Sequence, residues 1–154
     1  MTHIIRPIEI QDLPQAYGLL NDLVRHENIG NPLKLTLEHM EQELFAPNAD
    51  WDGLVAAKDT EIIGICFYSF ANTSRPMNST PLIYIDDLYV HPKYRRQNIA
   101  KNLLKEITKI ARQSHISRIE LWCVKTNSHG QNFYQKIGAK KLEHIDVFRL
   151  NVDK

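Results

Sequence analysis

Cysteine is scarce in this sequence, with only Cys66 and Cys123 among its 154 residues. Each lies in an apolar, strand-like run, so we expect two buried free thiols rather than a disulfide or a ligand pair. No apolar run approaches the roughly 18 residues that a membrane-spanning helix needs. The first residues lack a cationic segment followed by an apolar stretch, so the sequence predicts no signal peptide and a cytoplasmic protein with no membrane partner.

Net charge is also almost absent. Lys plus Arg is 19 and Asp plus Glu is 18, which leaves a formal charge of +1. This total argues against a dedicated nucleic-acid-binding protein, since such proteins are usually strongly basic on one face. The neutral total hides a division, however, because residues 1–90 sum to −8 and residues 91–154 sum to +9. Either the segregation is chance on solvated surfaces, or the C-terminal half binds an anionic ligand and the N-terminal half a cationic one.

Metal-ligand spacing is missing as well. The 7 histidines show no pattern typical of metal ligands, so no metal site is expected. The chain contains no internal repeat and no linker-like stretch, and its 43 % hydrophobic content is ordinary for a globular protein. We therefore predict a single domain over residues 1–154.

Hydrophobic periodicity predicts an α/β protein with a mixed sheet. A turn at residues 59–61 joins two β-rich runs into an antiparallel hairpin. The strand–helix–strand order over residues 82–124 implies a crossover and a parallel pair. Strands are predicted over 4–8, 54–57, 62–70, 82–90 and 118–124, with a final strand or strand pair over 140–150. Helices are predicted over 13–26 (with Asp12 as N-cap), 37–45 (with Thr36 as N-cap), 99–111 and 127–137.

A short basic loop precedes the helix with the clearest periodicity. The segment 91–101 reads His-Pro-Lys-Tyr-Arg-Arg-Gln-Asn-Ile-Ala-Lys. The first backbone N–H groups of a helix have no partner inside the helix and lie at the positive end of its dipole. A loop that leads into such an end can bind a phosphate or pyrophosphate, and Arg95, Arg96 and Lys101 add positive charge there. Many basic loops precede helices, so this spacing alone does not identify a ligand.

The segment Arg95-Arg96-Gln97-Asn98-Ile99-Ala100 resembles the acyl-CoA loop of the GNAT superfamily of N-acetyltransferases, whose pattern is Arg/Gln-x-x-Gly-x-Gly/Ala. The resemblance continues through residues 88–92 before the loop, and through Asn127 and the run Asn-Phe-Tyr-Gln-Lys-Ile-Gly-Ala at 132–139 after it. The order of elements matches along the whole chain. The resemblance implies the GNAT fold, a twisted mixed sheet with helices on both faces that is splayed near Leu88, with acetyl-CoA as co-substrate and no metal.

Two residues depart from the GNAT pattern. Asn98 replaces the central glycine, and Arg96 stands where a glycine often follows the first arginine. Glycine allows close approach of the backbone to phosphate and a positive φ. Asparagine is the next most tolerant residue for a left-handed backbone. The resemblance implies cofactor contacts from Leu88, Tyr89, Val90, Arg95, Arg96, Gln97, Asn98, Ile99, Ala100, Lys101, Asn127 and Tyr134.

Acetyl transfer to an amine requires an acceptor for the amine proton and a proton donor for the departing thiolate. The resemblance places Tyr134 near the sulfur, where its hydroxyl suits the second task. Taken alone, Tyr134 could also be a core aromatic and Asn127 only a helix cap. Asp86 and Asp87 are adjacent in an apolar strand, and buried acids are costly unless paired. We expect Asp86 to be catalytic, although a bulge could instead leave Asp87 facing solvent.

The sequence most resembles the diamine (spermidine/spermine) and thialysine acetyltransferase branch of the superfamily. That branch carries a Glu-Asp pair where Asp86-Asp87 stands, and an aromatic-Glu pair where His26-Glu27 stands. These four residues are therefore predicted to bind a small cationic amine, with an exposed helix-end acid as the alternative for Glu27. A protein lysine or N-terminal acetyltransferase and a noncatalytic acyl-CoA-binding sensor or interaction module are the other functions considered. Homodimers are common in the family, so a homodimer is possible by resemblance.

Overall fold

A computed structural model describes residues 2–27, 33–72 and 81–152 of the protein. The chain divides into two compact units, Met1–Trp122 and Cys123–Lys154, which are considered separately. The first unit contains β1 (Ile4–Pro7), α1 (Leu13–Glu27), α2 (Leu37–Phe45), β2 (Trp51–Lys58), β3 (Glu61–Ala71), β4 (Leu82–Val90), α3 (Ile99–Gln113), β5 (Ile119–Leu121) and the 3₁₀ turns η1 (Ile10–Asp12) and η2 (Pro92–Tyr94). The second unit contains α4 (Ser128–Lys136).

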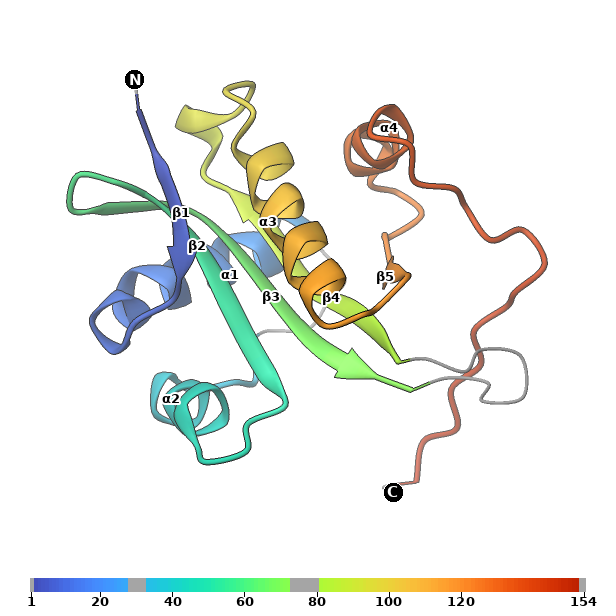
Figure 1. The fold of residues 1–154 in the computed structure, drawn as a ribbon, viewed down its shortest axis with the longest axis horizontal. Helices are drawn as coiled ribbons and strands as arrows, with labels where there is room; N and C mark the ends of the chain where they lie inside the picture. The colour runs from blue at the N-terminus through green and yellow to red at the C-terminus, as the bar shows by residue number, and fades with distance from the viewer. Residues whose placement is uncertain (1, 28–32, 73–80, 153–154) are drawn as a thin grey trace. The chain divides into compact units, whose positions relative to one another are not determined.

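The first unit is built on one mixed sheet with the strand order β1-β2-β3-β4-β5. Neighbouring strands from β1 to β4 are antiparallel, whereas β4 and β5 are parallel and are joined through α3. Figure 1 shows α3 on the near side of this sheet and α1 on the far side. This arrangement confirms the predicted α/β class, the antiparallel hairpin and the parallel crossover.

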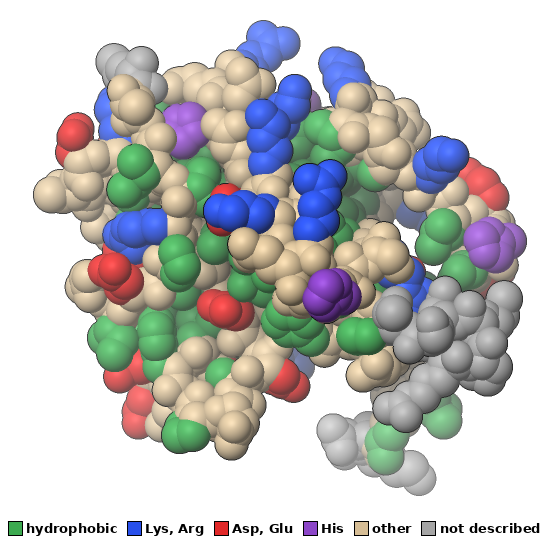
Figure 2. Space-filling model, viewed as in Figure 1, with side chains coloured by type: hydrophobic (Ala, Val, Ile, Leu, Met, Phe, Trp, Pro, Cys, Tyr) green, Lys and Arg blue, Asp and Glu red, His purple; other side chains and the backbone are tan. Residues whose placement is uncertain are grey.

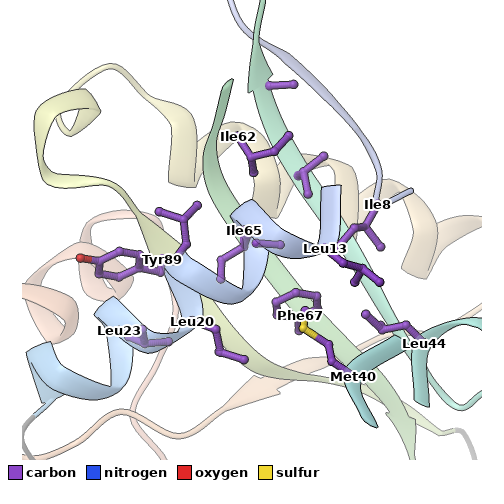
Figure 3. Packing of buried hydrophobic residues seen from close by; sticks show 14 residues of the cluster. Ile8, Leu13, Leu20, Leu23, Met40, Leu44, Ile62, Ile65, Phe67 and Tyr89 are labelled. Carbon is purple, nitrogen blue, oxygen red and sulfur yellow. The ribbon is translucent and has the colours of Figure 1, made fainter. Parts of the chain in front are cut away.

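Separate hydrophobic clusters cover the two faces of the sheet. On the α1 face, Leu13 and Leu20 of the helix pack with Ile65 and Phe67 of β3, as Figure 3 shows. On the α3 face, the helix contributes the buried residues Ile99, Leu103, Ile107 and Ala111. Their spacing of four places them along one stripe of the helix, which explains why the periodicity of this segment predicted it so well.

Local signals account for several boundaries. The side chain of Thr36 accepts a hydrogen bond from the backbone N–H of His39 at 3.1 Å, which confirms the predicted cap of α2. Asp59 turns the β2–β3 hairpin with a φ of 54°. The side chain of Asp12, in contrast, turns back toward β1. It makes two bonds to the guanidinium of Arg6, at 2.6 and 2.9 Å, and accepts the N–H of Glu9.

The final predicted strand is wrong. Residues 139–152 form neither helix nor strand, and β5 is also shorter than predicted, since it ends at Leu121. The apolar residues that suggested the final strand are exposed, from 43 % for Leu142 to 92 % for Phe148. A strand needs a partner for its backbone groups, and the described part of the second unit, 123–152, contains no other strand. Alternation alone therefore does not form one.

The cysteines match the sequence prediction in part. Cys66 is a buried thiol as expected, but Cys123 is partly exposed, and its Sγ lies 3.8 Å from the carbonyl of Val124. No helix within the described ranges has the length and apolar character to span a membrane.

Candidate functional site

The end of β4 is open along the edge that faces β5. The two strands pair only from Ile83 to Ile85 of β4, so the following residues have no partner in β5. On the other edge, the N–H of His91 donates to the carbonyl of Ile63 in β3 at 3.0 Å. Hydrogen-bonded pairs alternate along an antiparallel ladder, so Leu88 and Val90 direct their backbone groups away from β3. The edge of β4 near Leu88, where the sheet is predicted to splay, is therefore not paired with β5.

The loop after β4 adopts the backbone conformation that glycine normally supplies. Arg96 has a φ of 63° and Asn98 a φ of 59°, and these are the two positions at which the sequence departs from glycine. Both residues and Gln97 between them are exposed. Asn98 is the N-cap residue of α3, yet no side chain caps this end of the helix. The first N–H groups of α3 are thus left to interact with a ligand or with water.

The tyrosine of η2 attaches this loop to the β2–β3 hairpin. Tyr94 is buried, and its hydroxyl donates a 2.5 Å hydrogen bond to Glu61. The ammonium groups of Lys58 and Lys93 lie 5.3 and 5.5 Å from the centre of its ring. Attractions of this kind, between a cation and an aromatic face, add to the anchoring. Sequence reasoning missed this contact, because Glu61 and Tyr94 meet only through the folding of the sheet.

Positive charge gathers beyond the loop. Lys101, Lys105 and Lys109 follow one another at intervals of four along α3, and all three are exposed. In Figure 2 Lys and Arg side chains accordingly gather over α3. The basic half of the sequence therefore provides a cationic surface next to the open end of a helix, a combination that suits an anionic ligand.

A β-bulge interrupts β4 at the two adjacent acids. The register pairs Tyr68 with Ile85 and Phe67 with Asp87, which leaves Asp86 as the extra residue. The sequence is compatible with a bulge that leaves Asp87 facing solvent, but in the structure Asp86 is exposed and Asp87 is partly buried. Side chains normally alternate between the two faces of a strand, and the extra residue interrupts this alternation. Odd-numbered residues of β4 therefore lie on one face before the bulge and on the other face after it.

The bulge directs the acids toward the α1 face. Before it, Ile85 belongs to the cluster beneath α3, whereas Tyr89 after it belongs to the cluster beneath α1. Asp87 lies two residues before Tyr89, so its side chain is on the same face of the strand. The hydroxyl of Ser69 donates to the carboxylate of Asp86 at 3.0 Å, and Trp51, which packs against the α1-side cluster, also hydrogen-bonds this carboxylate. Ser69 and Trp51 gave no signal in the sequence.

Three carboxylates gather on this face around Asp87. The pKa of Asp87 is raised to about 7, mainly by burial and to a smaller extent by the negative charges of Asp86 and Glu27. Burial also raises the pKa of Glu27, the last residue of α1. The pKa of Asp86 is raised by burial against the opposing effect of its hydrogen bonds. Crowded carboxylates that resist ionisation form a favourable environment for an ammonium group.

An arginine and two aromatic rings connect the acids with the loop. The Nε of Arg95 donates to the carbonyl of Val90 at 3.0 Å, and its guanidinium carbon lies 5.3 Å from the centre of the Tyr89 ring. That ring lies 6.4 Å from the ring of His26, which precedes Glu27 in α1. The first unit thus brings together His26, Glu27, Asp86 and Asp87, the four residues for which the sequence predicts a role in substrate binding.

The remaining predicted residues lie in the second unit. The side chain of Asn127 accepts the N–H of Gly130 at 2.9 Å and so caps α4. A Cβ at Gly130 would lie 2.6 Å from the Nδ2 of Asn127, so the cap requires glycine there. Tyr134 lies two turns along the helix, partly exposed, with its ring 5.3 Å from that of Phe133. Because α4 contains no buried residue, Tyr134 is not a core aromatic of this unit.

The geometry of the first unit fits a thioester that carries a pyrophosphate. Left-handed backbone at Arg96 and Asn98 and the uncapped start of α3 suit the pyrophosphate. The backbone groups of Leu88 and Val90 on the open edge suit an amide-containing arm. Within the described residues, no group of three or more His, Cys, Asp or Glu side chains could hold a metal ion.

Comparison with known proteins identifies relatives of the chain. The family model described as "Acetyltransferase (GNAT) family" matches residues 20–139. A thialysine N-epsilon-acetyltransferase from Bos taurus is 24 % identical over 152 residues, covering 93 % of this chain and 87 % of the relative. A spermidine/spermine N(1)-acetyltransferase-like protein 1 from Homo sapiens is 26 % identical over 157 residues, covering 96 % of this chain but 22 % of that protein.

Solved structures share the fold. AAC(6')-Iy in complex with the bisubstrate analogue CoA-S-monomethyl-acetylneamine superposes with a TM-score of 0.81 at 18 % identity, covering 98 % of this chain and 99 % of that one. A possible acetyltransferase from Clostridium difficile 630 has a TM-score of 0.82 at 18 % identity, with complete coverage of both chains (100 % each).

The positive φ of Asn98 predicts that alanine and glycine at this position affect the stability of the protein differently. We expect Asn98→Ala to lower the free energy of unfolding by about 1 kcal/mol, because an alanine side chain is strained in left-handed backbone. Asn98→Gly should leave it unchanged or raise it. Gln97→Ala, at a neighbouring position without positive φ, is the matched control. Urea unfolding measures all three, and equal stability of the alanine and glycine variants at position 98 would contradict the assignment.

Proposed function

Because the chain belongs to the GNAT family and is an N-acetyltransferase, we propose that it transfers an acetyl group from acetyl-CoA to a small cationic primary amine. The observation that carries the proposal is the group of three carboxylates on the α1 face, formed by Glu27, Asp86 and Asp87. Next to them lies the open edge of β4, and this strand leads directly into the basic loop. One strand therefore joins a site suited to a cation with a site suited to an anion.

In this proposal acetyl-CoA binds along the end of β4 and the start of α3. The pyrophosphate interacts with the backbone of residues 95–101 and with the side chains of Arg96 and Lys101. The pantetheine arm hydrogen-bonds the backbone of Leu88 and Val90, beside Tyr89. Asn127 and Tyr134 are the cofactor contacts that the GNAT resemblance implies for the second unit. The match of the family over residues 20–139 extends across both compact units, which supports a single domain over residues 1–154.

The chemistry begins with an amine that must lose a proton. An alkylamine with a pKa near 10.4 requires about 4–5 kcal/mol to become neutral at pH 7. Asp86 accepts this proton, directly or through a water molecule, while Asp87 and Glu27 hold a second ammonium group and His26 contacts the carbon chain. The exposure of Asp86 gives it access to the acceptor, and its bond from Ser69 fixes its orientation.

Transfer then proceeds by direct attack. The neutral nitrogen forms a bond to the acetyl carbon, and the C–S bond breaks as the tetrahedral intermediate collapses. A backbone N–H near Leu88 stabilises the oxyanion, and the hydroxyl of Tyr134 gives its proton to the departing thiolate. The excess proton on the attacking nitrogen passes, directly or through water, to the tyrosinate that remains, so that an amide and a free thiol are formed. No protein nucleophile is needed, which is consistent with the inert environment of Cys66, where burial raises the pKa of the thiol.

The relatives support an amine substrate of the polyamine or thialysine type. Besides the two relatives described above, an L-ornithine N5-acetyltransferase from Arabidopsis thaliana is 27 % identical over 119 residues, covering 77 % of this chain and 48 % of that protein. Each substrate in the names of these relatives carries more than one ionisable nitrogen. An acceptor with two cationic groups matches the three carboxylates better than a peptide, whose lysine offers a single charge.

A panel of amines tests the proposal. Release of free CoA thiol is measured with spermidine, thialysine, ornithine, matched monoamines, and peptides with a free N-terminus or a lysine. We expect diamines to exceed monoamines of equal length in kcat/KM by about tenfold or more, since an additional charge pair with desolvated carboxylates is lost in the monoamine. Preference for peptides would instead indicate a protein acetyltransferase. Tight binding of CoA without any turnover would indicate a noncatalytic sensor.

Tyr134→Phe should separate catalysis from binding. Removing the hydroxyl takes away the proton donor for the thiolate, so kcat is expected to fall about 100-fold, with the KM for acetyl-CoA nearly unchanged. Phe133→Leu, on the adjacent residue of α4, is the control for helix integrity. Initial rates at saturating amine provide the measurement. An unchanged kcat in Tyr134→Phe would show that the thiolate takes its proton from another group.

The pKa of Asp87 near 7 predicts pH-dependent binding of the acceptor. Below this pKa the carboxyl is protonated and neutral, and above it the carboxylate attracts a cation. A bis-quaternary diammonium compound, which has no titratable proton and cannot be acetylated, should therefore inhibit about three- to tenfold more strongly as pH rises from 6 to 8. Asp87→Asn should abolish this change, and Glu27→Gln should move its midpoint to lower pH. An identical midpoint in Asp87→Asn would refute the assignment.

A further inference from the structure

We infer that Arg95 is a positioning residue that ties the cofactor loop to the acceptor side of the sheet, and is not a ligand of the pyrophosphate. This inference rests on the proposed function, because it assigns Arg95 a role within the same site. It also revises the role suggested by the sequence, in which the charge of Arg95 served to bind the anion directly. Its neighbour Arg96 retains that role.

Within the described part of the chain, Arg95 turns its side chain back toward β4. Its Nε donates to the carbonyl of Val90 at 3.0 Å, five residues earlier in the chain. Its guanidinium carbon lies 5.3 Å from the centre of the Tyr89 ring, and the same group hydrogen-bonds the side chain of Tyr89. A guanidinium engaged with both a carbonyl and an aromatic side chain is fixed in orientation. Arg96, in contrast, is exposed on the loop itself.

Each contact leads to a different part of the site. Val90 belongs to the open edge of β4, where its backbone is proposed to meet the pantetheine arm. Tyr89 belongs to the opposite, α1-side cluster and is only 7 % exposed. In Figure 3 its ring lies beside Leu23 of α1 and its hydroxyl points out of the cluster. A single side chain therefore contacts both the cofactor edge and the face that carries the acids.

The path continues to the acceptor residues. The ring of Tyr89 lies 6.4 Å from the ring of His26, and the charge of Asp22 acts on the Tyr89 hydroxyl in opposition to Arg95. His26 and Asp22 both belong to α1, the helix that ends at Glu27. Removing Arg95 should therefore alter the position of Tyr89 and, through it, the end of α1. An ordinary phosphate ligand would have no such effect on the amine.

Two acetyl donors distinguish the roles. Acetyl-pantetheine carries the reactive thioester and the pantetheine arm but no pyrophosphate. We expect Arg95→Gln to lower kcat/KM about tenfold with both donors, since a hydrogen bond from a charged group is lost in either case, and to raise the KM of the amine. Arg95→Lys should restore little, because an ammonium group cannot supply the planar Nε–H and the ring contact. Arg96→Gln, the matched control, should impair acetyl-CoA only.

A phosphate ligand predicts the reverse pattern. If Arg95→Gln impairs acetyl-CoA but not acetyl-pantetheine, and Arg95→Lys restores activity, the inference is overturned. Equal loss of kcat with unchanged KM values for every substrate would point to partial unfolding and would also count against a positioning role.

A second measurement is independent of turnover. In a double-mutant cycle with Arg95→Gln and Tyr89→Leu, urea unfolding of the free protein reports whether the two residues interact. We expect the unfolding equilibrium constant of the double variant to differ by about fivefold from the value obtained by multiplying the effects of the two single variants. If the two effects simply multiply, the residues do not interact and the inference is contradicted. If the wild-type protein acetylates no amine while this coupling is present, the proposed function fails and the contact assigned to Arg95 stands.

Discussion

The extra residue at Asp86 determines which face of the sheet carries the chemistry. In an uninterrupted strand, residues at intervals of two share a face, so Asp87 would lie with Ile85 beneath α3. The bulge reverses this parity, and Asp87 and Tyr89 face α1 while Leu88 and Val90 rejoin the α3-side cluster. The last turn of α1 can then approach the acids with Glu27, some 60 positions away in the sequence. A single inserted residue thus creates the acidic group on which the proposed acceptor site depends.

The same strand explains why a protein with a formal charge of +1 is so unevenly charged. Burial raises the pKa of both Asp87 and Glu27, and the charges of Asp86 and Glu27 add to the shift of Asp87, so a cation that binds there is stabilised. A few residues further on, β4 leads into the basic loop and the exposed lysines of α3. The division between an acidic and a basic half of the chain therefore corresponds, within the first unit, to two adjacent regions. Arg95 lies between them and contacts residues on both sides of β4.

The basic loop differs from the GNAT pattern in its residue types but keeps the backbone conformation that the pattern requires. Arg96 and Asn98 have the positive φ for which glycine is usually selected. The backbone that would meet a pyrophosphate is thus preserved, at the expense of some strain and with an additional cationic side chain. The loop consequently lends little support to a noncatalytic sensor.

The sequence by itself determined the helices that depend on local hydrogen bonds and on the spacing of apolar residues. It also contained the basic loop at 95–100 and the motif at 132–139 that reveal the family. The four-residue spacing of Ile99 and Leu103 defines α3, and the caps at Thr36 and Asn127 begin their helices where predicted. Only the tertiary structure decided that Asp86 is the bulged residue, that Ser69 and Tyr94 support the site, and that Arg95 turns back to Val90. It also decided that residues 140–150 form no strand. These outcomes depend on strand register and on contacts between residues that are distant in the chain, and a local sequence pattern does not specify either of them.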